Sequence, residues 1–312
     1  ENMSYKNQTI LNTIKGINNT YYLPSIQRKF VWSMQQIEDL FDSILQGYPI
    51  GTFLFWSVEK GDNPSHIDQY VFYEFINKYC DKDDSEFIQK KLSKPSCKDK
   101  IIAVLDGQQR LSSLYCAIQG SYAVKTSKKI SPDNPYPPRE LYLNLLYEPK
   151  LETDSANEFK FLTESEAEKK DINQYWLKVK EVIKWSSDGG GVVYVKKQAK
   201  ELVKKIKGEF STISDNELED IEIKIELLWT RSDLDEILDI FVRVNSAGTQ
   251  LSKSDLVFST IVARWEEGRE KIEDLLETLN DKGDGFKFDK DFIINLCLSL
   301  MDLPQKFAVK TF

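Results

Sequence analysis

Residues 101–114, IIAVLDGQQRLSSL, form the stretch of this sequence whose residue types are best suited to chemistry. A short apolar run of the kind found in covered strands leads into Asp106 and Gly107, and a helical pattern follows. The first N–H groups of a helix lack partners within the helix, and the helix dipole adds partial positive charge there. Because Gly107 lets a ligand approach the backbone and Arg110 offers a fork of donors, this turn is suited to phosphate.

The other side chains of the turn leave two interpretations open. Gln108 and Gln109 supply neutral donors and acceptors, whereas the Asp106 carboxylate repels a phosphate unless Mg²⁺ or a basic group lies between them. In the alternative, Asp106 caps the helix and Arg110 forms a salt bridge. Two adjacent glutamines and an arginine weaken this alternative, because capping a helix requires none of them.

Two further segments carry polar residues that could reach the same ligand. Gln27 and Arg28 lie in an extended or turn segment, and Arg28 could bind an anion or simply pair with a carboxylate. Arg243 and Asn245 are expected to close a helix, with Gly248 in the turn after it. A helix-turn-helix that reads DNA is disfavoured here, because the helix expected next has a single lysine.

Hydrophobic periodicity predicts the elements that position these residues. Ser33 and Gln36 have the spacing of a capping box, and apolar residues then recur at helical intervals from Ile37 onward. Leu111, Leu114, Tyr115 and Ile118 share one face of the helix that follows Gly107. The sequence also predicts strands over 52–58, 101–105, 141–146, 159–163 and 223–229, and a helix over about 233–244.

Composition excludes several classes of protein. The 312 residues include a single histidine, His66, so neither a His-rich zinc site nor an HNH nuclease, which needs at least two histidines, can form within this chain. No G-x-S-x-G sequence is present, which argues against a Ser-His-Asp site. The formal charge of −8 argues against a broad non-specific nucleic-acid footprint, while 41% hydrophobic residues provide for a substantial core.

The sequence also indicates a cytoplasmic protein. The four cysteines form no C-x-x-C pair, and a disulfide framework would be sparse for this length. The N-terminal residues, ENMSYKNQTI, lack the basic and apolar regions of a signal peptide, and the apolar runs are far shorter than a membrane span. The chain stops soon after an apolar helical pattern, so we expect a fragment of a longer protein.

Taken in order, four segments resemble the N-terminal domain of GmrSD-type restriction proteins, a domain family that also occurs in SspE-like antiphage effectors. The segments are PSIQRKFVW, DSILQGYPIG, VLDGQQRL and FVRVNSAGTQLS. The family implies an α+β fold, with a ParB/sulfiredoxin-like mixed α/β core followed by a largely helical region. It also implies NTP binding or hydrolysis, and a role in attacking modified or foreign DNA.

The resemblance can be carried over residue by residue. Its D-G-Q-Q-R motif falls on residues 106–110, where we expect Asp106, Gln109 and Arg110 to act in catalysis and Asp106 to hold Mg²⁺. The NTP-binding residues that the resemblance and the turn imply are Gln27, Arg28, Gly107, Gln108, Arg110, Arg243 and Asn245. More distant ParB proteins grip a triphosphate with a G-E-R-R motif at this point. Sulfiredoxins place a reactive cysteine in the corresponding turn, where this sequence has glutamines, so their redox chemistry is not supported.

The leading hypothesis is an NTP-binding and NTP-hydrolysing regulatory domain of a DNA restriction or antiphage defence protein. We expect residues 1–148 to form the NTP-binding core and residues 149–312 to form a mostly helical region that contributes the R-V-N-S-A-G turn. Full-length relatives often carry an HNH nuclease domain, so the cutting of DNA is assigned to a missing segment or a partner chain. The base of the NTP and any homo-oligomer stay open.

Two other functions compete with this hypothesis. The first is a DNA-binding module without nucleotide chemistry, for which residues 202–209, LVKKIKGE, are the best basic stretch. Such a run is more often a solvated helix face than a binding site. The second is a plain interaction scaffold, which would keep its fold and bind no nucleotide.

Overall fold

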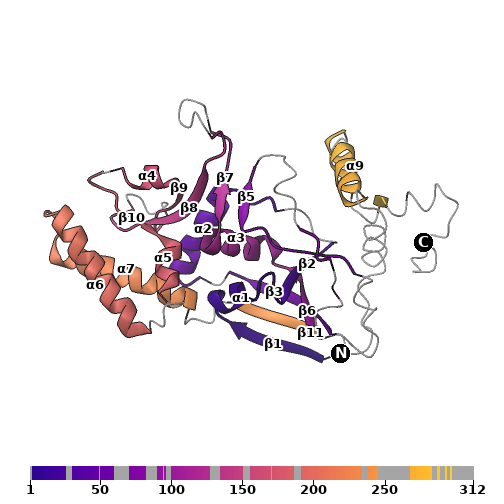
Figure 1. Ribbon diagram of the computed structural model, residues 1–312, viewed down its shortest axis with the longest axis horizontal. Helices are drawn as coiled ribbons and strands as arrows, with labels where there is room; N and C mark the ends of the chain where they lie inside the picture. The colour runs from indigo at the N-terminus through magenta and orange to yellow at the C-terminus, as the bar shows by residue number, and fades with distance from the viewer. Residues whose placement is uncertain are drawn as a thin grey trace.

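The computed structural model of the chain has an α+β architecture with two β-sheets, which confirms the predicted fold class (Figure 1). The structure describes the following residues: 2–25, 30–48, 50–59, 70–81, 90–93, 95, 100–126, 134–149, 155–169, 171–185, 191–233, 238–244, 268–282, 287–288, 292–293 and 296. Within these ranges, none of the helices combines the length and apolar character that crossing a bilayer demands.

The first sheet has six strands in the order β1-β11-β3-β6-β2-β4. Their bounds are β1 Asn2–Gln8, β11 Leu238–Val244, β3 Thr52–Glu59, β6 Lys100–Asp106, β2 Tyr21–Pro24 and β4 Phe72–Tyr73. β11 runs parallel to β3, and β3 runs antiparallel to β6. The carboxyl end of β6 therefore lies beside the amino ends of both β3 and β11.

The second sheet has five strands, four of them in the order β10-β8-β7-β5, with β9 on β8. Their bounds are β10 Trp176–Lys178, β8 Pro138–Asn144, β7 Ser121–Ala123, β5 Lys78–Cys80 and β9 Phe159–Leu162. β8 and β9 confirm the strands that the sequence predicted over 141–146 and 159–163. Leu141 and Leu143 of β8 and Phe159 and Phe161 of β9 belong to the main hydrophobic core. Burial alternates along β9, whereas the last four residues of β8 are all buried.

The helices described by the structure differ in length and in surroundings. They are α1 Ile10–Gly16, α2 Met34–Leu45, α3 Gln108–Gln119, α4 Glu164–Ala167, α5 Val179–Lys184, α6 Val192–Glu209, α7 Asp215–Asp233 and α9 Gly268–Lys282. α2 and α3 lie between the two sheets, and α6 and α7 pair as a hairpin on one side of them (Figure 1).

The main hydrophobic core lies between the first sheet and these helices. Phe53 and Phe55 of β3 and Val104 of β6 join it, whereas Trp56 and Ala103 of the same strands belong to a second cluster on the opposite face. This alternation is what a strand covered on both faces produces. In α3 every residue from position 108 to 118 is buried except Arg110, so the helix that carries the motif is central to the fold.

α2 forms where the sequence predicted it. The Ser33 hydroxyl accepts the Gln36 N–H, and the Gln36 side chain accepts the Ser33 N–H at 2.9 Å, which completes the capping box. Ile37, Phe41 and Ile44 lie on the buried face. Because this start signal is contained in four consecutive residues, it does not depend on tertiary packing.

Two elements of the second half were predicted wrongly. Residues 223–229 are not a strand but part of the helix α7: Ile225 and Leu228 are buried, whereas Ile223 is 49% exposed and Leu227 is 37% exposed. The buried residues recur at a helical interval, so the period-two reading was incidental. Residues 238–244, predicted as the end of a helix, form β11, because strands on both sides bond to this segment, which is rich in β-branched and aromatic residues.

β11 comes from the region predicted to be mostly helical, yet it completes the first sheet between β1 and β3. It therefore links the predicted second region directly to the sheet that carries the motif.

The described cysteines, Cys80 and Cys116, are buried and free of disulfides.

Candidate functional site

The turn between β6 and α3 has the geometry of an anion-binding helix start. Gly107 is the residue before the helix, with φ +84° and ψ +9°, and its carbonyl accepts the Leu111 N–H at 2.9 Å. No side chain caps the helix, and its first turn has no acidic residue. The interpretation of Asp106 as the helix cap is therefore wrong, because Gly107 occupies the cap position and has no side chain to accept a hydrogen bond.

Gly107 is required at this turn for two reasons. Its left-handed backbone conformation is one that residues with a Cβ rarely adopt. In addition, a Cβ at this position would lie 2.8 Å from Cε1 of Phe53, a buried residue that is 1% exposed. The glycine thus permits both the sharp turn and the close packing of the turn on β3.

Arg110 points back from α3 toward the loop before β3. Its guanidinium donates to the carbonyl oxygens of Ile50 and Thr52, the second at 2.8 Å. It also lies over the Phe53 ring, 4.6 Å from the centroid. Its distance to the Asp106 carboxylate is 3.9 Å, and that carboxylate is 73% exposed, so the ion pair of the alternative interpretation is a weak one.

The two glutamines of the motif are turned inward. Gln108 is 6% exposed and Gln109 is 7% exposed. Gln109 Oε1 accepts the backbone N–H of Val31 at 3.0 Å, and the Gln109 carbonyl accepts the Ser113 hydroxyl at 2.7 Å. Gln109 therefore holds the chain just after the segment of Gln27 and Arg28 against the start of α3.

Of the other predicted ligands, Arg243 alone falls among the residues that the structure describes, and there only its backbone position is described. Gln27, Arg28 and Asn245 lie outside the described residues. Phe241 of β11 and Asp106 of β6 pair with Leu54 of β3 from its two sides. Arg243 lies two positions beyond Phe241 in β11. At about 3.3 Å per residue and 4.8 Å per strand, the backbone of Arg243 is roughly 12 Å from that of Asp106.

Comparison with known sequences decides the family. The family described as "GmrSD restriction endonuclease, N-terminal domain" matches residues 9–262, which is most of the 312 residues. The chain belongs to this family. A GmrSD N-terminal domain is a module of restriction and defence proteins, as the four sequence segments had indicated.

One relative of this GmrSD N-terminal domain is an uncharacterized protein of Methanocaldococcus jannaschii. It is 34% identical over 130 residues, which are 41% of this chain and 20% of the relative. The chain thus spans about a fifth of the length of that curated relative.

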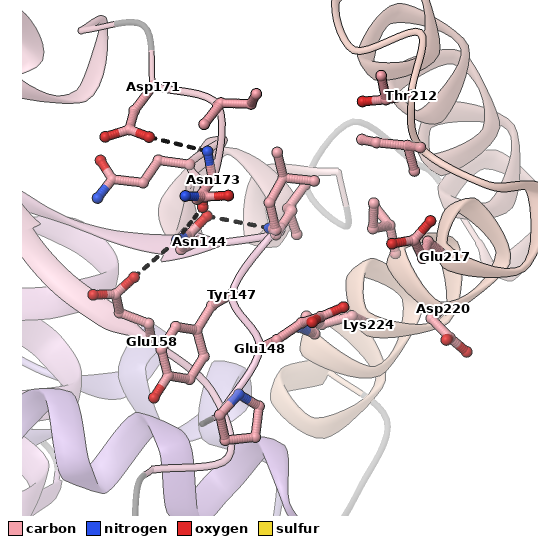
Figure 2. A pocket seen from close by; sticks show the side chains of 17 residues that line it. Asn144, Tyr147, Glu148, Glu158, Asp171, Asn173, Thr212, Glu217, Asp220 and Lys224 are labelled. Carbon is pink, nitrogen blue, oxygen red and sulfur yellow. Dashed lines mark hydrogen bonds between the residues drawn. The ribbon is translucent and has the colours of Figure 1, made fainter. Parts of the chain in front are cut away.

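The GmrSD N-terminal domain also has a cavity of about 1010 Å³ between the second sheet and α7 (Figure 2). None of the residues predicted from the sequence lines it. Its charged lining consists of Glu148, Glu158, Asp171, Glu217, Asp220 and Lys224. Burial lowers the pKa of the Lys224 amine, and the nearby Asp220 and Glu148 carboxylates only partly oppose this. The excess of carboxylates makes the cavity unfavourable for phosphate.

The most buried polar side chain of this cavity is already engaged. Asn144, 2% exposed, donates to Glu158 Oε2 at 2.8 Å and accepts the N–H of Leu146 at 3.1 Å (Figure 2). It also accepts the N–H of Tyr175 at 3.0 Å. These bonds fix the chain as it leaves β8. Among the described residues, no group of three or more His, Cys, Asp or Glu side chains is placed to hold a metal ion.

Proposed function

We propose that this GmrSD N-terminal domain binds a nucleoside triphosphate at the β6–α3 turn and hydrolyses it, and that this controls a DNA-cutting nuclease. The observation that carries the proposal is the left-handed Gly107 at the uncapped start of a central helix. Such a helix start supplies backbone N–H donors and a favourable dipole for a phosphate group.

The side chains around the turn supplement these backbone donors. The Arg110 guanidinium has five N–H groups, and only two of them are used by the Ile50 and Thr52 carbonyls. Those that remain suit phosphate oxygens, and Gln108 belongs to the same proposed set through its place in the first turn of α3. The proposed NTP-binding set also includes residues from two further segments of the chain: Gln27, Arg28, Arg243 and Asn245.

Asp106 is the proposed Mg²⁺ ligand. Its carboxylate is 73% exposed at the end of β6, next to the helix start. Mg²⁺ is usually held by one or two carboxylates together with waters and substrate phosphates, so a single exposed carboxylate fits this ion. A bound Mg²⁺ would offset the repulsion between Asp106 and the phosphates and stabilise charge on the transferred group.

We assign distinct roles to the three residues proposed for catalysis. Asp106 orients the metal or the attacking water, and Arg110 stabilises negative charge on the phosphates. Gln109 acts indirectly in this scheme, because its side chain accepts the backbone N–H of Val31 and so fixes the chain beside the start of α3. The ParB-like character of the core is part of the same proposal.

Calorimetric titration with the four ribonucleoside triphosphates in Mg²⁺ tests this proposal. Arg110→Ala should weaken the affinity roughly 10- to 100-fold, because a charge-assisted hydrogen bond contributes roughly 1.5–3 kcal/mol. Arg139→Ala is a matched control, since Arg139 lies in β8 of the second sheet and pairs with Glu166 of α4. Equal heats for wild type and Arg110→Ala would refute the phosphate site, and full phosphate release by Asp106→Asn would refute the role of Asp106.

A second candidate function, binding of DNA without nucleotide chemistry, is favoured by the surface of α6. This helix has six lysines and two glutamates. Lys204 and Lys205 are exposed and form no ion pair with any residue that the structure describes. Lysines of this kind can neutralise DNA phosphates with a strong dependence on salt. A gel-shift titration at low salt without nucleotide decides between the two, because absence of binding eliminates this candidate.

A further inference from the structure

The loop between α2 and β3 is held at both ends by arginines from other helices. It begins after Leu45 and ends at Thr52. Two of its residues, Gly47 at φ +80° and Gly51 at φ +84°, have left-handed backbone conformations. Each of these glycines lies against a guanidinium group, that of Arg231 at Gly47 and that of Arg110 at Gly51.

Arg231, in the last turn of α7, lies at the carboxyl end of α2. The Gly47 N–H donates to the Ile44 carbonyl and the Tyr48 N–H donates to the Ser43 carbonyl, both at 2.9 Å, which is a Schellman ending. A Cβ added at Gly47 would lie 2.6 Å from Nη2 and 2.9 Å from Cζ of Arg231. The guanidinium therefore occupies the space that any other residue at position 47 would need.

Electrostatics explain why a cation is placed there. The last turn of α2 has no basic residue of its own, and the carboxyl end of a helix carries partial negative charge. Arg231 supplies the missing positive charge from a helix about 185 residues away in the sequence. α7 is thus joined to the loop by charge as well as by packing.

The other end of the same loop is bonded to the motif. Arg110 donates to the carbonyls of Ile50 and Thr52, and a Cβ on Gly51 would overlap its Nη1. The direction of the Arg110 guanidinium consequently depends on where these two carbonyls lie. A shift of the loop would therefore redirect the N–H groups of Arg110 that are proposed to bind phosphate.

From this arrangement we infer that Arg231 is a positioning residue for the nucleotide site and links the α6–α7 hairpin to the D-G-Q-Q-R turn. It acts on the far end of the loop that orients Arg110. The inference rests on the proposed function, because its effect is read as nucleotide affinity. A change in the position of α7 against α2 then changes the affinity for the nucleotide without any contact between α7 and the nucleotide.

Calorimetry tests this inference with the Mg²⁺ complexes of the four ribonucleoside triphosphates and with inorganic triphosphate, which needs no base recognition. Arg231→Gln should raise the Kd about tenfold, within the range of couplings between separated sites, and Arg231→Lys, which keeps the charge, less than about threefold. Arg139→Gln is the matched control: it removes another partly buried arginine and should lower the unfolding temperature while the Kd stays unchanged. A Kd unchanged in Arg231→Gln, or raised equally in Arg139→Gln, would overturn the inference.

A second measurement separates failure of this inference from failure of the proposed function. If the wild-type chain binds neither NTP nor triphosphate, the proposed function falls and the effect on affinity falls with it. The contact itself is then judged by a double-mutant cycle of unfolding midpoints. Gly47→Ala should lower the midpoint less in the Arg231→Gln background than in the wild type, because the guanidinium that its Cβ meets is absent. Strictly additive shifts would show that Arg231 does not hold the loop.

Discussion

Gly107→Ala is the substitution whose cost follows most directly from the geometry of the turn. At φ +84° an alanine pays about 1–2 kcal/mol for the left-handed conformation. Its Cβ would also lie 2.8 Å from Cε1 of Phe53, which is 1% exposed and cannot turn away because the Arg110 guanidinium covers its ring. Overpacking of this kind costs about 1–3 kcal/mol. The two effects together predict a loss of about 2–5 kcal/mol in the free energy of unfolding.

Urea unfolding, followed by tryptophan fluorescence, measures this loss. Gly208→Ala in α6 is the matched control, since a Cβ there meets nothing within 4 Å and its φ is not positive. In a helix this change should stabilise by about 0.5–1 kcal/mol. A change of less than about 0.5 kcal/mol in the free energy of unfolding of Gly107→Ala, the range of an ordinary surface substitution, would show that the turn does not require glycine.

Two further predictions concern ionisable groups away from the turn. Burial alone would raise the pKa of Glu166, but hydrogen bonds from Thr163 and the Arg139 guanidinium hold it below the ordinary value of 4.5. The resulting stability is present above about pH 4.5 and lost as the pH falls through the folded pKa. Glu166→Gln should therefore lower the melting temperature at pH 7 by a margin that shrinks toward pH 3, and a constant margin would contradict this. Burial raises the pKa of Cys116 to about 12, and its thiol contacts the Ser121 carbonyl at 3.1 Å, so iodoacetamide at pH 8 should label it only after unfolding, as peptide mass mapping can check.

The parts of the fold that were predicted correctly have local signals. The start of α2 is specified by Ser33 and Gln36, and the joint between β6 and α3 by an apolar run that ends in Asp106 and Gly107 before a helical pattern. The wrong prediction of a strand over residues 223–229 arose because the same apolar residues fit both the helical and the strand periodicity. Ile223, Ile225 and Leu227 alternate as in a strand, and the side of the segment that is buried depends on packing of α7 against distant elements.

In the candidate site, too, local features could be predicted from the sequence and contacts between distant residues could not. The joint of a strand and a helix at residues 106–110 could be predicted, because a helix start needs only its own backbone, and anion binding there stays a prediction. The partners of Arg110 could not be read, since the carbonyls of Ile50 and Thr52 are 60 and 58 residues away in sequence. The secondary structure around Arg243 was predicted wrongly, because residues 238–244 were assigned to a helix and form β11. Arg231 carries no local signal, as only the tertiary structure brings it to Gly47.

Amide hydrogen exchange with and without NTP and Mg²⁺ locates the nucleotide on the chain. A nucleotide at the D-G-Q-Q-R turn should slow exchange in peptides that cover residues 105–112, with a smaller effect in the α2–β3 loop. It also predicts no change in the peptides that line the acidic cavity, which include residues 144–149 and 217–224. Protection confined to those cavity peptides, or no protection anywhere at saturating NTP, would contradict a nucleotide site at the D-G-Q-Q-R turn.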